Sequence, residues 1–217
     1  LDAYDVCIVG SGAGGGMVAK VLAEAGAEVV MLEAGAPWDT RSDSQMFAWP
    51  YDSPRRGAGT ERPFGEFDAC IGGWELDGEP YTVTAGERFD WFRARMLGGR
   101  TNHWGRISLR YGPNDFRRRS LDGLGDDWPI SYEELKPYYD SLDRLVGLFG
   151  SVEGLPNEPD GIFQTPPRPR CYELLIKQSC DRLGVTCIPS RMSILTQAHN
   201  GRSACHYCGQ CGRGCRT

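Results

Sequence analysis

Four cysteines near residue 210 have a spacing that points directly to chemistry. They lie within eleven residues and follow the pattern C-x2-C-x2-C-x3-C, at Cys205, Cys208, Cys211 and Cys215. Thiolates at this spacing are typical ligands of an iron–sulfur cluster. A zinc site matches less well, because zinc ligands usually come as two separated pairs. Structural thiols or a disulfide are further interpretations.

A glycine-rich turn near the start of the chain predicts a dinucleotide site. An apolar run over 5–9 leads into GSGAGG and then a helix-like stretch. The first glycine allows a tight turn, the second a close approach of the backbone to a pyrophosphate, and the last packing of the helix against the strand. The N–H groups at the helix start would face phosphate. The residues assigned to this turn are Gly10, Gly12, Ala13, Gly14 and Gly15.

An acidic residue completes the dinucleotide pattern. A second apolar run, 28–32, ends on Glu33, and Ala34 follows it in the same expected site. A carboxylate at the end of the second strand can accept hydrogen bonds from ribose hydroxyls. The alternative is an ordinary α/β domain in which the glycine turn is structural and Glu33 is solvated.

The elements expected next to the glycine turn must hold it in position. Apolar residues at helical spacing predict a helix over 17–25, with Gly26 as its C-cap. The stretch 36–79 is irregular and rich in aromatic residues, and we expect it to pack through those rings. Residues 81–84 predict a short strand.

The second half of the chain predicts two helices. Ser131 and Glu134 form a capping-box pattern at the start of the first, which Pro137 would restart or kink. Its expected apolar face comprises Tyr138, Leu142, Leu145, Val146 and Phe149. A linker over 151–169 precedes a second helix at 172–183. A short strand is expected near 185–188.

Composition bounds the possible functions. The 217 residues include 24 basic and 29 acidic side chains, for a net charge of −5. This mild acidity argues against a nucleic-acid partner, and no apolar run reaches the ~18–20 residues of a membrane span. No signal peptide is visible. Cys7, in the first expected strand, is predicted to be buried as a small apolar residue.

Two further motifs carry a family resemblance. The first is LGGRTNHW at 97–104, and the second is DWPISY at 127–132 followed by PYY at 137–139. With the glycine turn, these motifs resemble the glucose–methanol–choline (GMC) oxidoreductases, which are FAD enzymes that oxidise alcohols and sugars. The likeness points to the bacterial sugar-dehydrogenase and pyranose-oxidase branch. Arg100 departs from the small residue that is common in the family.

The resemblance implies an α/β fold. We expect a Rossmann-like FAD-binding domain of GMC type, incomplete, with long irregular excursions and part of a helical, substrate-side region. Residues 1–125 would form the FAD-binding region with its flavin-covering segment. Residues 126–150 would be a helical segment. Residues 151–217 would comprise a linker, a helix and the cysteine-rich segment, leading into an absent substrate domain.

The segment around residue 100 is expected to contact the flavin. Its two glycines let the backbone lie flat against a ring, and Thr101 and Asn102 can form hydrogen bonds near the reactive edge. In similar pyranose oxidases a Thr-His-Trp triplet attaches the flavin covalently through its histidine. Here His103 either does the same or is a hydrogen-bonded histidine beside the site. The residues assigned to FAD here are Arg95, Gly98, Gly99, Thr101, Asn102, His103 and Trp104.

By the same resemblance, the expected reaction oxidises a sugar or glycoside hydroxyl to a ketone or lactone by hydride transfer to flavin N5. The family's base is a histidine with a nearby asparagine or second histidine, in a C-terminal part. No catalytic residue is therefore assigned within this chain, and a second chain or C-terminal fragment is expected to complete the site. Some relatives carry a three-iron cluster, so the cysteines would hold a 3Fe–4S or 4Fe–4S cluster. A small subunit and a cytochrome acceptor would then be partners.

Three other functions fit parts of the sequence. A pyranose-oxidase-like enzyme would use oxygen as acceptor and need no cluster. A non-catalytic flavin or electron-transfer subunit would keep the cofactor fold without the base. A nicotinamide enzyme would explain the glycine turn and leave the segment at 97–104 unexplained.

Overall fold

The computed structural model describes most of the chain and divides it into two compact units. The described residues are 3–37, 39, 41–42, 72–73, 82–87, 93–209, 211–212 and 214–215. The first unit takes 1–105 and 208–216, and the second takes 106–207 with 217. This division falls inside the first of the three segments expected from the sequence, whose bounds stay a prediction.

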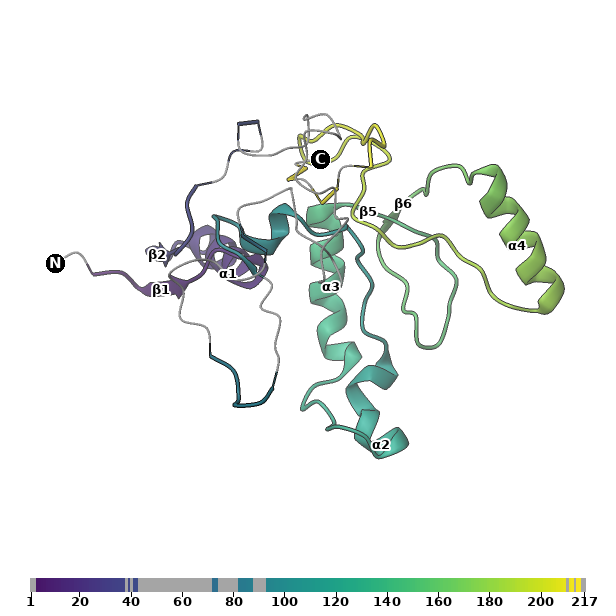
Figure 1. Cartoon of the computed structure of the whole chain (residues 1–217), viewed down its shortest axis with the longest axis horizontal. Coiled ribbons are helices and arrows are strands. Elements are labelled where there is room, and N and C mark those ends of the chain that lie inside the picture. The colour runs from purple at the N-terminus through teal and green to yellow at the C-terminus, as the bar shows by residue number, and fades with distance from the viewer. Residues whose placement is uncertain are drawn as a thin grey trace. The chain divides into compact units, whose positions relative to one another are not determined.

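The first unit is built on a strand–helix–strand motif (Figure 1). Strands β1 (Val6–Val9) and β2 (Val29–Leu32) pair in parallel, and helix α1 (Ala13–Glu24) contacts both. The expected order of elements is confirmed. The helix begins earlier than the expected residue 17, because close packing of Gly15 against β1 offsets the low helix propensity of glycine. Gly26 follows the helix with φ +92°, as its expected role as a helix stop requires.

Side chains alternate along β1, and this overturns the expectation for Cys7. Ile8 is buried against the unit, whereas Cys7 is exposed and Val9 is 82 % exposed. Successive strand residues point to opposite faces. Cys7 and Val9 therefore share the face of β1 that the described residues leave uncovered, and Cys7 is not the buried residue that we predicted.

A third backbone segment lies beside the motif. Ala36 forms a parallel bridge with the buried Met96, and the Leu97 N–H donates to the Ala36 carbonyl at 2.9 Å. Strand β3 (Gly72–Gly73) pairs antiparallel with β4 (Arg93–Ala94). Thus the segment that leads into residues 97–104 is fixed next to the end of β2.

Two expectations fall in or near the undescribed residues. Most of the irregular stretch 36–79 lies outside the described residues, as do its aromatic residues Trp38, Phe47, Trp49, Tyr51, Phe64, Phe67 and Trp74. The strand expected at 81–84 is wrong for 82–84, which have no regular structure, while Tyr81 is not described. Threonine and valine favour strands only where a partner strand packs beside them.

Helices of the second unit include η4 (Pro113–Arg117), α2 (Arg118–Asp122) and α3 (Tyr132–Val146). The capping box of α3 is confirmed, because the Glu134 N–H donates to the Ser131 hydroxyl and the Ser131 N–H donates to the Glu134 carboxylate. Of the two expectations for Pro137, a restart is wrong, since α3 runs through it, and a kink stays a prediction. Proline removes one backbone donor, and the rest of the helix compensates.

The buried face of α3 differs from the expected one. Tyr132 and Asp143 are buried, and the expected Leu145 and Val146 are partly buried. Tyr138, however, is 72 % exposed, and Leu142 is also exposed. Phe149 is buried but lies beyond the helix. The apolar face is displaced because a buried arginine, Arg110, binds the polar residues of α3, so charge rather than apolar area decides which face turns inward.

Short extended segments hold the rest of the second unit together. Strands β5 (Leu148–Phe149) and β6 (Phe163–Gln164) pair in parallel, and Met192 bridges both Phe149 and Ile107. The apolar core of this unit comprises Phe116, Tyr132, Leu148, Phe149 and Leu195. The stretch 151–169 is therefore not a simple linker, because it contains β6.

Helix α4 (Cys171–Leu183) confirms the second predicted helix. None of its residues is buried within the described chain. The strand expected at 185–188 is absent, because these described residues have no regular structure. A single apolar run without a neighbouring strand to pair with does not make a strand.

Candidate cofactor-binding site

The glycine turn after β1 contains two glycines that the local geometry requires. Gly10 has φ +91°, a left-handed conformation that side chains with a Cβ rarely adopt. A Cβ on Gly15 would lie 1.9 Å from the Gly10 carbonyl oxygen. The turn can therefore bring α1 against β1 only with glycine at both positions, as the sequence predicted.

The same turn leaves open space in front of α1. A Cβ on Gly12 or Gly14 would meet no atom within 4 Å. Gly12 is the N-cap of α1, no side chain caps the helix through it, and the first turn contains no acidic residue. Uncapped N–H groups beside open space suit an anionic phosphate. These residues therefore fit the pyrophosphate of a dinucleotide.

The carboxylate of Glu33, directly after β2, accepts hydrogen bonds from residues of two backbone segments. Its Oε2 accepts hydrogen bonds from the Ser11 hydroxyl at 2.5 Å and the Ser11 N–H at 2.9 Å, and its Oε1 accepts from the Gly35 N–H at 2.7 Å. These donors lower the pKa of Glu33 to about 2, so it is ionised at neutral pH. Its expected contact with ribose stays a prediction.

The segment at 97–104 lies against the glycine turn. Gly98 and Gly99 have φ of +88° and +54°, and the short helix η3 (Gly99–Asn102) follows. A Cβ on Gly99 would lie 3.6 Å from the Gly12 Cα, and the Gly98 N–H donates to the Ser11 hydroxyl at 2.8 Å. The structure thus brings together two sets of expected cofactor residues that are far apart in sequence.

Other expected residues of this segment shape the turn itself. The Thr101 hydroxyl donates to the Gly98 carbonyl at 2.6 Å, and the Asn102 amide donates to the Leu97 carbonyl at 2.8 Å. Arg95 and Trp104 are partly buried, whereas Ala13 and Ala34 are exposed. Thr101 and Asn102 therefore have a demonstrable local role in holding the two left-handed glycines.

His103 follows η3 and is buried. Burial lowers the pKa of its imidazole, because the charged form loses water, and the nearby positive charge of Arg100 lowers it further. His103 is therefore a neutral imidazole at physiological pH. In this form one ring nitrogen donates and the other accepts, which suits contact with a cofactor.

Comparison with known proteins agrees with this geometry. Residues 3–44 match the model of an FAD binding domain. The chain is 34 % identical to 2-methyl-1,2-propanediol dehydrogenase of Mycolicibacterium austroafricanum, over 94 % of this chain and 35 % of the relative. It is 32 % identical to paromamine 6'-oxidase of Streptomyces fradiae (96 % and 34 %) and 30 % identical to the fructose dehydrogenase large subunit of Gluconobacter japonicus (76 % and 30 %).

The FAD-domain match, these relatives and the motifs at 10–15 and 97–104 agree. The chain belongs to the GMC oxidoreductases. It spans about a third of the length of the curated relatives it matches. Within this GMC chain, the strand–helix–strand motif of β1, α1 and β2 lies inside the region that matches the FAD binding domain.

The cysteine run of the GMC chain is divided between the two units. Cys205 belongs to the second unit, and Cys208, Cys211 and Cys215 belong to the first. Among the described residues, no three His, Cys, Asp or Glu side chains are placed to hold a metal ion. Within the first unit, a Cβ on Gly212 would lie 3.7 Å from the His103 carbonyl oxygen. The segment that carries these three cysteines of the first unit therefore lies beside His103.

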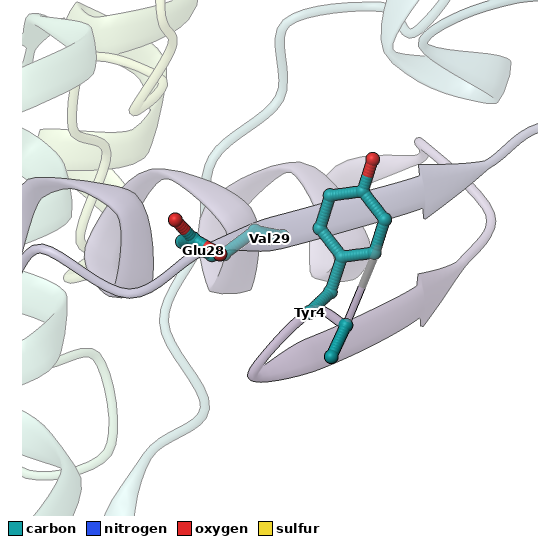
Figure 2. Close-up of a pocket in the computed structure, with 4 residues that line it drawn as sticks. Tyr4, Glu28 and Val29 are labelled. Carbon is teal, nitrogen blue, oxygen red and sulfur yellow. The ribbon is translucent and has the colours of Figure 1, made fainter. Parts of the chain in front are cut away.

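A second concavity lies at the other end of the strands. A shallow hollow of about 540 Å³ is lined by Ala3, Tyr4, Glu28 and Val29, at the amino ends of β1 and β2 (Figure 2). In open α/β sheets, ligands bind outside the carboxyl ends of the strands. The glycine turn marks that carboxyl end, so this hollow is not the cofactor site.

Sequence reasoning missed Ser11 and Gly35. Ser11 is buried and bonded to both Glu33 and Gly98, and a Cβ on Gly35 would lie 2.2 Å from the Met96 nitrogen. A hydroxyl placed between two glycines of the turn was the available signal for Ser11. Gly35 gave no signal beyond its place after Glu33.

In the described part of the chain, no helix has the length and apolar character that crossing a membrane requires.

Proposed function

We propose that this chain is the FAD-binding part of a GMC enzyme that oxidises a CH–OH group of a sugar or glycoside to a carbonyl. The observation that carries the proposal is the junction of the glycine turn with the segment at 97–104. Gly99 approaches Gly12, and the Gly98 N–H bonds to Ser11. A nicotinamide site would need only the first of these two segments.

The relatives support the reaction class. They are named as a diol dehydrogenase, a paromamine oxidase and a fructose dehydrogenase subunit. All three names describe oxidation of hydroxylated molecules. The sugar or glycoside is therefore the substrate class that we propose, and a diol belongs in any panel of test substrates.

In this proposal the residues of the chain bind and orient the cofactor. The N–H groups at the start of α1 bind the pyrophosphate, and Glu33 binds the ribose through acceptor capacity that its protein partners leave. The segment from Gly98 to Trp104 lies at the flavin ring, with His103 as a neutral contact. A bound FAD would supply the acceptor for the hydride of the substrate.

The proton acceptor for the substrate hydroxyl is proposed to lie outside these residues. His199 and Asn200 are adjacent, but in the second unit they contact the Arg144 carbonyl at 2.7 and 3.3 Å, at the end of α3. They are therefore occupied as a helix cap. We propose that the remaining two thirds of a relative-sized protein, or a partner chain, provides the base.

The iron–sulfur cluster is a separate part of the proposal. Its support is the cysteine spacing together with the position of Gly212 beside His103. A small subunit and a cytochrome would accompany it. The name of the fructose dehydrogenase relative, a large subunit, implies further subunits for that protein. Iron analysis of the protein purified under nitrogen tests this part, and absence of iron would remove it.

The main proposal is tested by anaerobic reduction of the full-length protein. We expect its flavin absorption band to bleach on addition of a sugar, glycoside or diol from a panel. Rapid recovery of the band with oxygen would identify an oxidase, and recovery only with an artificial acceptor would identify a dehydrogenase. A flavin band that no hydroxylated compound bleaches would instead support a non-catalytic flavin subunit. Protein without a flavin band would contradict the proposal.

A further inference from the structure

We propose that Ser11 is a positioning residue, whose hydroxyl clamps the segment at 97–102 onto the glycine turn while Glu33 orients that hydroxyl. The inference rests on the proposed function, because it gives the clamp the task of holding backbone where the flavin is to bind. It assigns Ser11 no contact with substrate. Neither the glycine pattern nor the acid after β2 by itself requires a hydroxyl here.

The direction of the hydrogen bonds is determined by chemistry. Glu33 is ionised and its carboxylate can only accept, so the single hydroxyl proton of Ser11 points to Oε2 at 2.5 Å. The lone pairs of that oxygen remain available, and the Gly98 N–H donates to them at 2.8 Å. The three groups therefore form one chain, from carboxylate through hydroxyl to amide.

Both carboxylate oxygens of Glu33 accept further hydrogen bonds, which fix the carboxylate in place. The Ser11 N–H also donates to Glu33 Oε2 at 2.9 Å, and the Gly35 N–H donates to Oε1 at 2.7 Å. Ser11 is only 9 % exposed. Bonds to a charged acceptor are stronger than neutral ones, so the carboxylate holds the hydroxyl in place.

Loss of the Ser11 hydroxyl would affect the contact between the segment at 97–102 and the glycine turn. The packing of α1 against β1 and β2 would stay in place. The approach of Gly15 to Gly10 and the contact of α1 with both strands do not involve the Ser11 side chain. The Gly98 N–H would lose its acceptor, and an amide without its partner opens more readily to water. The segment at 97–102 should then loosen while the strand–helix–strand motif persists.

Hydrogen exchange of the Gly98 amide in the full-length protein tests the clamp without turnover. We expect Ser11→Ala to accelerate this exchange by about tenfold or more, with β1 and β2 amides unchanged. Ser11→Thr keeps the hydroxyl and should restore protection. Ser179→Ala is the matched control, since its exposed hydroxyl bonds only to the Leu175 carbonyl of α4, at 3.0 Å. Unchanged Gly98 exchange in Ser11→Ala would overturn the proposal.

Two further measurements separate positioning from a general loss of stability. Should Ser11→Ala not fold, Ser11→Cys replaces it: a thiol is close in size to the hydroxyl but a weak acceptor, so Gly98 exchange should still rise. Gly98 exchange that stays at the wild-type rate in this variant would also overturn the clamp. For an active enzyme, Ser11→Ala should lower kcat with KM within about twofold of wild type, and Ser11→Thr should recover kcat. Failure of the proposed function would leave the exchange result intact.

Discussion

The glycines of the turn after β1 have two different physical roles. Gly15 is required by the protein itself, because a Cβ there would lie 1.9 Å from the Gly10 carbonyl oxygen. Gly12 is not, since a Cβ there would meet nothing within 4 Å and its φ of −63° is open to any residue. Gly15 is therefore required for packing of α1 against β1, whereas Gly12 leaves space for a ligand in front of the helix.

Gly15→Ala should destabilise the full-length protein. The new methyl group would meet rigid backbone, and such overpacking typically costs about 1–3 kcal/mol. Thermal unfolding measures this loss. The matched control is Gly16→Ala, where a Cβ would lie at an ordinary 3.6 Å from the Ser11 carbonyl oxygen. This control should be neutral or stabilise by up to about 1 kcal/mol, because alanine favours the helix.

The Glu33 carboxylate predicts a pH dependence of stability. Folding lowers its pKa from 4.5 to about 2, chiefly through the Ser11 hydroxyl. A carboxyl with a lowered folded-state pKa stabilises the fold above its unfolded pKa, and this contribution is lost as pH falls through the folded value. The stability difference between wild type and Glu33→Gln should thus be constant above about pH 5 and shrink towards pH 2.

Denaturant unfolding of both proteins across this pH range measures the difference. Glu24→Gln serves as the control, because it removes one partner of the exposed Lys20–Glu24 pair on α1. This pair should contribute less than about 1 kcal/mol at neutral pH. A Glu33→Gln difference that stayed constant down to about pH 3 would show that the carboxylate is not the group that these donors stabilise.

At the scale of elements, helix α3 is fixed by charge. Arg110 donates to the Asp140 carboxylate at 2.6 Å, to the Asp143 carboxylate at 2.5 Å and to the Tyr132 hydroxyl at 3.1 Å. The Arg110 side chain is 3 % exposed. A helix that turns this face inward depends on the arginine to neutralise the buried Asp143 and the part-buried Asp140.

Arg110→Met should destabilise the protein by about 3–5 kcal/mol, because it removes the guanidinium that neutralises the buried Asp143 and the part-buried Asp140. Lys136→Gln is a matched comparison, since Lys136 pairs with the same Asp140 at 2.9 Å but is 47 % exposed. Exposed pairs contribute about 0–1 kcal/mol. Equal effects of the two substitutions on the unfolding midpoint would contradict a buried network at Arg110.

The elements differ in how far the sequence predicts them. The capping box of α3 and the strand–helix–strand order depend on local contacts, and both are confirmed. The buried face of α3 depends on an arginine that approaches from residue 110, so a helical plot of apolar residues selected Tyr138 instead. Of the strands expected at 81–84 and 185–188, the described residues 82–84 and 185–188 pair with no strand in the described part of the chain, which local propensity does not reveal.

At the scale of the whole molecule, the exposed apolar side chains are informative. Val9 and Leu32 at the ends of the paired strands are exposed, and α4 buries none of its residues. Parallel strands are usually covered on both faces. The curated relatives are about three times as long, so further chain or a partner is proposed to cover these surfaces.

The candidate site was predictable in its parts and not in its assembly. Each glycine motif carries its own local pattern, so the sequence identified residues 10–15 and 97–104 separately. The hydrogen bond from Gly98 to Ser11 joins positions 87 residues apart, and nothing in either motif specifies that pairing. The division of the cysteines between two units was likewise not predictable from their close spacing.

The central claim is that the open space before Gly12 holds FAD. The most direct test is the FAD content of the full-length Gly12→Val protein, measured by release and quantification of flavin beside wild type and Gly16→Ala. We predict a folded Gly12→Val protein, because its Cβ would meet no described atom within 4 Å. Its FAD content should be reduced at least about tenfold, as expected for a blocked phosphate site. A folded Gly12→Val protein that retained wild-type FAD would contradict the account.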